Sequence, residues 1–390
     1  MEKIGVYCDI ISGYAFKASD LKASGDVPIV KIGNISNRHG IIFDSNTQYV
    51  DNALLSINNK YHIQNGDILI SLTGSHINQP NSMVGRCCRN TSNILFLLNQ
   101  RAGKAIPKTN VDKDYLYHLF CLDAVKFSIA NMAYGGANQV NVSPKDIMKI
   151  RWEFPLISVQ QKIASILSTY DTLIENNTKR IRLLEQMAEN LYKEWFVRFR
   201  FLGHENVEME NGLPKGWKVE RIKECVKRLP YGRTYTANEL SQEGSVIVID
   251  QSTSELLGYH NNAPSHYASF DSPIILFGDH SCKFCFMTRN FSLGENVIPF
   301  ISKDANEIDI CFLYFATHKL IVTEEYKRHW GRFSAMKILI PQIELQQKFS
   351  KLVIEFEKLK QSLIAANSLL TRQRDLLLPR LMSGKLEVTL

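Results

Sequence analysis

The chain of 390 residues is 45% hydrophobic and 22% charged, which is the composition of a globular protein and excludes a disordered or fibrous one. Its net charge of +7 is spread along the chain, so it permits a nucleic-acid partner without requiring one. No stretch of about 18 apolar residues predicts a membrane span, and no signal peptide is predicted at the N-terminus. We therefore expect a cytoplasmic protein without a membrane partner.

The first 157 residues predict an α/β unit. Short runs rich in β-branched and apolar residues alternate with turn signals at Val27–Ile32, Ile68–Leu72 and Ile94–Leu98, as expected for strands. A helix is predicted near Asp112–Asn131.

Residues 158–202 predict one long coiled-coil helix. Ser158 is the expected N-cap, and no Pro or Gly follows before Gly203. Apolar residues recur at alternating steps of four and three, which is the spacing of a heptad seam. The seam residues are Ile163, Leu167, Tyr170, Ile174, Asn177, Ile181, Leu184, Ala188, Leu191 and Trp195. Asn177 either sets the register of this seam or lies at its frayed edge.

Residues 203–342 repeat the organisation of the first unit after a polar, Gly-containing linker at 203–217. Strands are predicted at Val246–Ile249, Ile274–Phe277 and Asn296–Ile301, and a helix near Asp309–Arg328. Six short segments of the first half recur in the same order in the second. They include Gly13–Leu21, which returns as Gly232–Leu240, and Phe154–Ile163, which returns as Ile340–Phe349. A repeat of this kind predicts a duplicated architecture.

Residues 343–390 predict a second long helix, Leu345–Leu378, followed by a tail, with Pro379 ending the helix. Its expected seam is Leu352, Phe356, Leu359, Leu363, Ala366, Leu370, Gln373 and Leu377. Antiparallel pairing of the two long helices would bury both apolar stripes. Pairing of either helix with another protein is the alternative.

The eight cysteines are expected to be reduced thiols, since no secretory signal is predicted. Cys282 and Cys285 have a spacing seen in zinc and redox sites, with His266 and His280 nearby. A zinc site usually needs a second pair of ligands, and both cysteines fall in an apolar run. We therefore predict buried packing and no metal site.

Sequence motifs of catalysis are missing. The chain has no P-loop, no Gly-x-Gly-x-x-Gly segment and no His-Glu-x-x-His segment, each of which marks a separate enzyme class. We predict no catalytic residues in this chain.

Polar loop side chains suited to DNA contact occur in both halves. Arg can pair with guanine O6 and N7, and Asn or Gln with adenine N6 and N7, whereas Lys, Ser and Thr more often contact phosphates. For any single residue, the alternative is a solvated side chain without a ligand. The candidate DNA-binding residues are Thr73, Ser75, Asn78, Gln79, Arg86, Asn99, Gln100, Arg101, Tyr134, Asn138, Gln139, Arg233, Tyr235, His280, Lys283, Arg289, Lys327, Arg328 and Arg332.

Two repeated α/β units, each ending in a Pro-…-Gln-Gln-Lys segment and a long helix, resemble the specificity subunit of type I restriction–modification enzymes. The resemblance spans essentially the whole chain. It is carried by Gly13–Leu21, Pro155–Ile163, Trp195–Phe199, Leu213–Trp217, Pro341–Phe349 and Leu376–Leu386.

The resemblance implies an α/β fold with two repeated target recognition domains joined by two long helices that pair as an antiparallel coiled coil. The expected boundaries are 1–157 for the first target recognition domain, 158–202 for the first long helix, 203–342 for the second domain, and 343–390 for the second long helix and the C-terminal tail.

The resemblance also implies a function. Each domain would read one half of a bipartite target in double-stranded DNA, and the coiled coil would set the spacing between the halves and dock two methyltransferase (M) subunits. Restriction/translocase (R) subunits would join for cleavage. This chain would bind no cofactor, while the partner subunits would use S-adenosylmethionine, ATP and Mg.

Two other functions fit the residues. The first is a non-catalytic coiled-coil scaffold that presents two domains binding something other than DNA. Its binding would respond little to salt, whereas DNA binding depends steeply on salt. The second is an enzyme with an unrecognised site, for which turnover by the purified chain would be the evidence.

Overall fold

The computed structural model describes residues 1–38, 40–79, 82–136, 139–252, 254, 256–322 and 327–388. The chain forms two compact units: unit 1 comprises Met1–Asn176 with Asn367–Leu390, and unit 2 comprises Asn177–Ala366. Each unit thus contains a globular α/β part and a portion of both long helices. The predicted boundaries, after residues 157, 202 and 342, separate the long helices from the globular parts. In the structure, each portion of a long helix shares a hydrophobic core with the globular part beside it.

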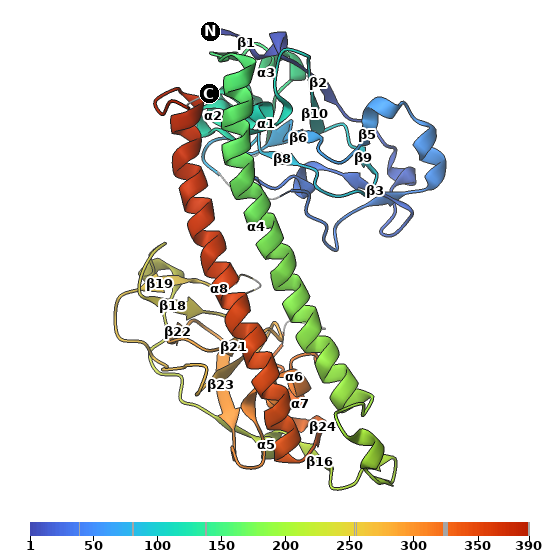
Figure 1. Cartoon of the computed structure of the whole chain (residues 1–390), viewed down its shortest axis with the longest axis vertical. Coiled ribbons are helices and arrows are strands. Elements are labelled where there is room, and N and C mark those ends of the chain that lie inside the picture. The colour runs from blue at the N-terminus through green and yellow to red at the C-terminus, as the bar shows by residue number, and fades with distance from the viewer. Residues whose placement is uncertain are drawn as a thin grey trace. The chain divides into compact units, whose positions relative to one another are not determined.

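Unit 1 is built on two four-stranded sheets (Figure 1). The first is antiparallel with the order β2-β10-β6-β8, and the second has the order β4-β3-β9-β5, in which β3 and β9 run parallel. Shorter pairings join β1 to β13, and β11 through β12 to β7. The strands are β1 (Glu2–Lys3), β2 (Cys8–Ser12), β3 (Val27–Val30), β4 (Tyr49–Val50), β5 (His62–Ile63), β6 (Ile68–Ser71), β7 (Thr73–Gly74), β8 (Cys87–Arg89), β9 (Phe96–Leu98), β10 (Ala102–Pro107), β11 (Tyr134–Gly136), β12 (Gln139–Asn141) and β13 (Arg151–Trp152).

The helix predicted near Asp112–Asn131 is two helices, α1 (Lys113–Cys121) and α2 (Asp123–Met132), followed later by the short α3 (Pro144–Ile147). Asp112 caps α1 by accepting a hydrogen bond from the amide of Tyr115 at 2.9 Å. The break falls at Leu122, which has extended backbone angles and buries its side chain in the core. Core packing of Leu122 thus interrupts a segment that periodicity alone reads as continuous.

Unit 2 repeats the first sheet of unit 1 and three strands of the second. Its antiparallel sheet has the order β17-β23-β20-β21, and its second sheet pairs β18 with a parallel β22 and an antiparallel β19. The strands are β14 (Met209–Glu210), β15 (Leu213–Pro214), β16 (Lys218–Arg221), β17 (Val226–Arg228), β18 (Val246–Ile249), β19 (Gly258–His260), β20 (Ile274–Gly278), β21 (Phe284–Met287), β22 (Phe291–Leu293), β23 (Val297–Ser302) and β24 (Lys337–Ile340). The shared strand order confirms the predicted duplication.

The helices of unit 2 are shorter than predicted. They are α5 (Ile222–Cys225), α6 (Ile310–Thr317) and α7 (Trp330–Ala335). The helix predicted near Asp309–Arg328 is wrong for residues 318–322 and 327–328, which are described and are not helical. Asp309 caps α6, accepting hydrogen bonds from the amides of Cys311 and Phe312.

The long helices are α4 (Ile157–Tyr192), extended by a π-helical turn at Lys193–Val197, and α8 (Ile343–Met382). Ser158 is not the N-cap, because the amides of Val159 and Gln160 already bond to the carbonyl of Leu156. Pro379 does not end α8, which continues to Met382. The last turn holds because Leu381 and Met382 are buried in the core of unit 1. Among the described residues, neither long helix is apolar enough over a sufficient length to cross a bilayer.

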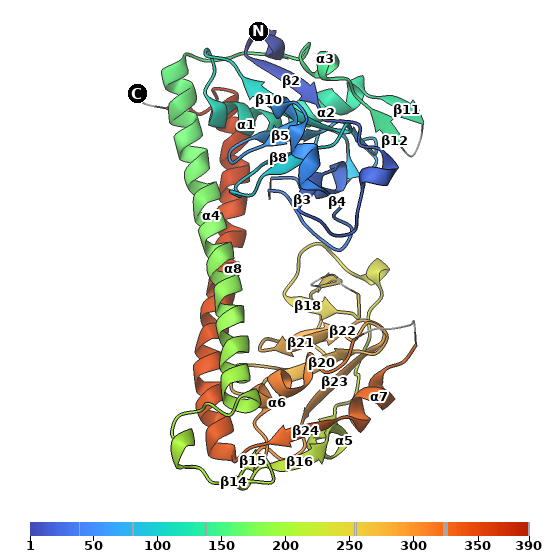
Figure 2. The same ribbon diagram turned by 90° about the vertical axis from the view of Figure 1, so that its right-hand side faces the viewer.

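In each unit, α4 and α8 lie side by side and run antiparallel (Figures 1 and 2). In unit 1, Ile163 and Leu167 share a core with Leu378 and Leu381. In unit 2, Ala188 and Leu191 share a core with Phe349 and Val353. Because residue numbers rise along α4 as they fall along α8, the pairing is antiparallel, which confirms the predicted fold class.

The predicted seam of α8 needs correction. The seam residues predicted in α4 are buried or half-buried, but Leu352 and Leu359 of α8 are 44% and 41% exposed, and Gln373 is exposed too. The inward positions belong to the next residue in each case, namely Val353, Lys360 and Arg374. Since three of the four residues in this inner row are polar (Lys360, Asn367 and Arg374), hydrophobic spacing alone does not identify it.

Three polar residues of the inner row contact α4 at intervals of seven residues. Lys360 lies 3.6 Å from the carboxylate of Glu185, and Asn367 donates to the carbonyl of Ile174 at 3.4 Å. Arg374 pairs with Asp171 at 2.7 Å, with only 6% and 14% of the two side chains exposed. Burial raises the pKa of Asp171, and Arg374 opposes that rise. Polar contacts inside a seam favour one register of the helices over others.

The repeated Gln-Gln-Lys segment connects each long helix to its globular part. Gln160 accepts a hydrogen bond from the amide of Asp112 at 3.0 Å, and Gln346 accepts one from the amide of Asp309 at 2.8 Å. Gln346 also donates to the carbonyls of Glu307 and Pro341. Both glutamines are almost fully buried, so each one joins the start of a long helix to the cap of α1 or α6.

We expect Gln346→Leu to lower the free energy of unfolding by about 1–3 kcal/mol, because it leaves buried polar groups at Asp309, Glu307 and Pro341 without their partner. The measurement is the urea midpoint followed by circular dichroism. Gln347→Leu is the matched control, because Gln347 is the adjacent, exposed glutamine. Equal shifts for the two variants would contradict this role of Gln346.

Candidate nucleic-acid interface

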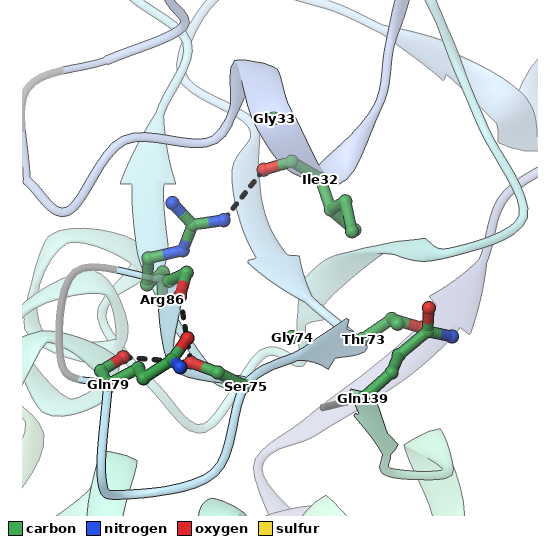
Figure 3. A pocket seen from close by; sticks show the side chains of 9 residues that line it. Ile32, Gly33, Thr73, Gly74, Ser75, Gln79, Arg86 and Gln139 are labelled. Atoms are coloured by element: carbon green, nitrogen blue, oxygen red, sulfur yellow. Dashed lines mark hydrogen bonds between the residues drawn. The ribbon is translucent and has the colours of Figure 1, made fainter. Parts of the chain in front are cut away.

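A pocket of about 250 Å³ opens on unit 1 (Figure 3). Its walls come from the turn after β3, from β7 and the loop that follows it, from the residue before β8, and from β12. The pairing of β12 with β7 brings these segments together. The pocket is lined by Ile32, Gly33, Thr73, Gly74, Ser75, Gln79, Ser82, Arg86 and Gln139.

Hydroxyl groups in the pocket wall are held by hydrogen bonds within the fold. The Thr73 hydroxyl donates to the side-chain oxygen of Asn141 at 2.7 Å. The Ser75 hydroxyl donates to the carbonyl of Gln79 and lies 2.8 Å from the hydroxyl of Ser82. A Cβ at Gly74 would lie 2.6 Å from the carbonyl oxygen of Ser82, so this close approach requires glycine. The loop is thereby fixed against β7.

Arg86 supplies positive charge at the pocket wall. Its Nη2 donates to the carbonyl of Ile32 at 3.0 Å, which places the guanidinium between the turn after β3 and the start of β8. Burial lowers the pKa of Arg86, but a guanidinium remains protonated in proteins. A held cation beside amide side chains suits a ligand rich in hydrogen-bond acceptors, such as a base edge or a phosphate.

Five of the predicted contact residues line this pocket: Thr73, Ser75, Gln79, Arg86 and Gln139. Thr73 and Ser75 are buried, so their side chains form the pocket wall and do not project into solvent. Gln79 and Gln139 are exposed, as are the nearby predicted residues Asn78 and Tyr134. The prediction for Asn138 lies outside the described residues.

The cluster Asn99-Gln100-Arg101 does not line the pocket. It forms the turn between β9 and β10, where Gln100 and Arg101 are exposed. The carbonyl of Arg101 accepts a hydrogen bond from the amide of Leu72 at 3.0 Å. The turn therefore lies beside the strand that leads into β7.

Tyr235 of unit 2 does not face outward, contrary to its predicted role in contacting DNA. It is 2% exposed and stacks on His260 with ring centres 4.2 Å apart. Arg233 lies over the Tyr235 ring and pairs with Glu239 at 3.1 Å. The sequence shows an aromatic residue in a loop but does not show which side of the loop faces the core.

The segments of unit 2 that correspond to the pocket walls carry different side chains. After β20, Asp279 accepts hydrogen bonds from the amides of His329 and Trp330, at 3.1 and 2.8 Å, and caps α7. The amide of His280 donates to the side chain of Gln251 at 3.1 Å. Lys283 donates to the carbonyl of Asp250, just after β18, much as Arg86 donates to Ile32 just after β3. The two units thus share a scaffold but differ in the chemistry they present.

The other basic residues predicted in unit 2 are exposed. Lys327 and Arg328 precede α7 and Arg332 lies within it, while Arg289 lies between β21 and β22. The Nε of Arg328 is 3.9 Å from Asp279.

A second cation–aromatic cluster, which residue types and spacing did not predict, is formed by Arg228, Tyr231 and Trp330. The guanidinium of Arg228 lies 5.3 Å from the centre of the Trp330 ring and 5.9 Å from that of Tyr231. The Arg-Leu-Pro-Tyr spacing between Arg228 and Tyr231 is visible in the sequence, but the approach of Trp330 depends on the tertiary fold.

Cys282 and Cys285 pack into different hydrophobic clusters of unit 2. The chain's eight cysteines are all free thiols. Over the part of the chain that the structure describes, no group of three His, Cys, Asp or Glu side chains is placed to hold a metal ion.

Comparison with known proteins agrees with this architecture. Residues 2–186 match the family model described as the type I restriction modification DNA specificity domain. The chain is therefore similar to type I restriction–modification specificity subunits. The similarity is not confined to the matched region, because relatives align with both halves of the chain.

One relative is the type I restriction enzyme MjaIX specificity subunit of Methanocaldococcus jannaschii, 28% identical over 323 residues that cover 74% of this chain and 73% of the relative. Another is the putative MjaX specificity subunit of the same organism, 22% identical over 93% of this chain and 87% of the relative. The crystal structure of a type I restriction–modification S subunit from M. genitalium has the same fold, with a TM-score of 0.60 and 16% identity over 100% of this chain and 96% of that chain.

Proposed function

We propose that this chain is the specificity subunit of a type I restriction–modification complex and binds double-stranded DNA in a sequence-dependent way, each globular part reading one half of a bipartite target. The observation that carries the proposal is that the two units repeat one strand order while corresponding segments present different side chains, such as Thr73 in unit 1 and Asp279 in unit 2. A duplicated scaffold with different loops suits two different half-sites. Loops on a rigid scaffold are where binding residues concentrate.

The pocket of unit 1 supplies the chemistry for one half-site. Gln79 and Gln139 are exposed amides beside the Arg86 guanidinium. Amides pair with adenine and guanidinium groups with guanine in the major groove.

The paired helices set the spacing between the half-sites in this proposal. The 36 residues of α4 span about 54 Å at 1.5 Å per residue. That length exceeds one turn of B-DNA, about 34 Å, so half-sites roughly one turn apart are within reach.

Exposed leucines of α8 dock the methyltransferase (M) subunits. Leu352 and Leu359 are one heptad apart, as are Leu369 and Leu376, and the four side chains are 41–62% exposed. An exposed heptad stripe on a helix that is already paired through its inner row suits a further helix from a partner. Two M subunits bind S-adenosylmethionine, and restriction/translocase (R) subunits use ATP and Mg. The chain itself is non-catalytic and acts in the cytoplasm.

The proposal predicts a split methylation motif in cells that carry this gene with its partner genes. Single-molecule sequencing of adenine methylation, compared with a strain lacking only this gene, should show the motif disappear. Replacing residues 1–157 with the corresponding part of another specificity subunit should change one half of the motif and leave the spacer and the other half unchanged. Identical methylation in both strains would count against sequence reading by this chain.

Once the motif is known, Gln139→Ala should relax recognition in the half-site of unit 1 by about 1–3 kcal/mol, because the amide that would read a base is lost. The measurement is competition binding of the assembled complex to duplexes that differ at single positions. Gln64→Ala is the control, an exposed glutamine of the same unit that does not line the pocket. An equal loss on all duplexes would indicate a phosphate contact instead.

The double variant Leu369→Glu and Leu376→Glu should abolish copurification of the M subunit while leaving the fold intact, because charges replace leucines on an exposed face. Ser368→Glu is the control, exposed and about 100° around the helix from Leu369. Copurification with both the double variant and the control would show that docking lies elsewhere.

A further inference from the structure

An arginine on the surface of unit 2 is held by two aromatic side chains. Arg228 is the last residue of β17 and is exposed. Its guanidinium lies over the rings of Trp330 and Tyr231, at 5.3 and 5.9 Å from the ring centres. Its Nη2 also donates to the Tyr231 hydroxyl at 2.7 Å. These contacts restrict an exposed side chain that would otherwise be free to sample many rotamers.

The two rings are themselves anchored. Trp330 packs against Phe300 and Phe333, with ring centres 5.6 and 5.4 Å apart, and its amide donates to Asp279 at 2.8 Å. The carbonyl of Tyr231 lies 3.1 Å from the buried His266 ring nitrogen. Arg228 therefore rests on a platform that belongs to the core of unit 2.

The charge of Arg228 is not neutralised by an acidic partner. Within the described ranges of the chain, Arg228 makes no ion pair, whereas Arg233 pairs with Glu239 at 3.1 Å and Arg328 lies 3.9 Å from Asp279. The alternative is that Arg228 only covers the Trp330 ring. That role would require the ring contact but not an exposed guanidinium without an acidic partner.

We propose that Arg228 is a base-reading residue of unit 2, pairing through its guanidinium with O6 and N7 of a guanine in that unit's half-site. This inference rests on the proposed function and assigns a residue to the second half of the target. Bidentate pairing of arginine with guanine is the commonest specific contact in the major groove. It gains from a guanidinium whose orientation is set before binding.

Neighbouring basic residues fit a different task. Lys327, Arg328 and Arg332 are exposed around the start of α7, close in sequence to Trp330. Exposed lysines and arginines often contact phosphates and set the position of a protein on the duplex without reading sequence.

The test compares Arg228→Gln with Lys227→Gln, each in the complex with the methyltransferase subunits. Lys227 is the adjacent exposed residue of β17, so the matched variant loses the same charge from the same strand. Each complex selects from a library of randomised double-stranded DNA, and the bound fraction is sequenced. Arg228→Gln should lose the preference for one guanine, in one half-site only, with affinity for the wild-type target falling about 5- to 150-fold. Lys227→Gln should keep the full motif.

Tyr231→Phe provides a second measurement that does not depend on removing the arginine. It keeps the ring and removes the hydroxyl that accepts the hydrogen bond from Arg228, so the preference for the same guanine should weaken by less than in Arg228→Gln. An equal loss of affinity for all sequences in Arg228→Gln, or an unchanged motif, would overturn the inference. If the wild-type complex selects no motif, the proposed function itself fails, which distinguishes the two outcomes.

Discussion

The structure depends on burial of the apolar rows of α4 and α8 against each other and against the globular part of each unit. Most helical stability in proteins comes from packing an apolar face rather than from helix propensity, so both helices depend on these contacts. In unit 1, Leu378 and Leu381 complete a core that contains Ile163, Leu167 and side chains of the sheet. Each buried leucine contributes about 1.5–3 kcal/mol. Unit 1 therefore needs both ends of the chain to complete its core.

Polar contacts within the helix pair trade some stability for a defined register. Arg374 and Asp171 are both largely buried and paired at 2.7 Å, yet burial still raises the pKa of Asp171. A buried ion pair adds little net stability compared with apolar residues of similar volume. The ion pair instead disfavours other registers of the two helices. Sliding the helices by one heptad would leave Arg374 beside a different residue of α4 and Asp171 without its partner. A fixed register suits a helix pair that is proposed to set a distance on DNA.

The two units share the attachment of the globular part to its long helix and differ in the side chains that follow the central strands. Gln160 and Gln346 make equivalent bonds to the caps of α1 and α6, so each globular part is attached to its helix in the same way. The segments after the central strands β6 and β20 instead carry unrelated side chains, such as Thr73 and Asp279. Function of this kind resides in sites placed on a fold rather than in the fold itself.

Sequence alone determined the duplication and the two long helices, because a heptad row such as Ile163 to Trp195 and a repeated Gln-Gln-Lys segment reflect local periodicity and order along the chain. Sequence favoured antiparallel pairing of the two helices but left pairing with another protein open. It also identified Arg86 and Gln139, whose residue types suit DNA contact. Tertiary packing alone decided the rest. It chose the row containing Val353 over the row containing Leu352, carried α8 past Pro379, broke a predicted helix at Leu122 and turned Tyr235 inward onto His260. In each case the outcome depends on contacts between residues far apart in the chain, which local periodicity and residue type do not encode.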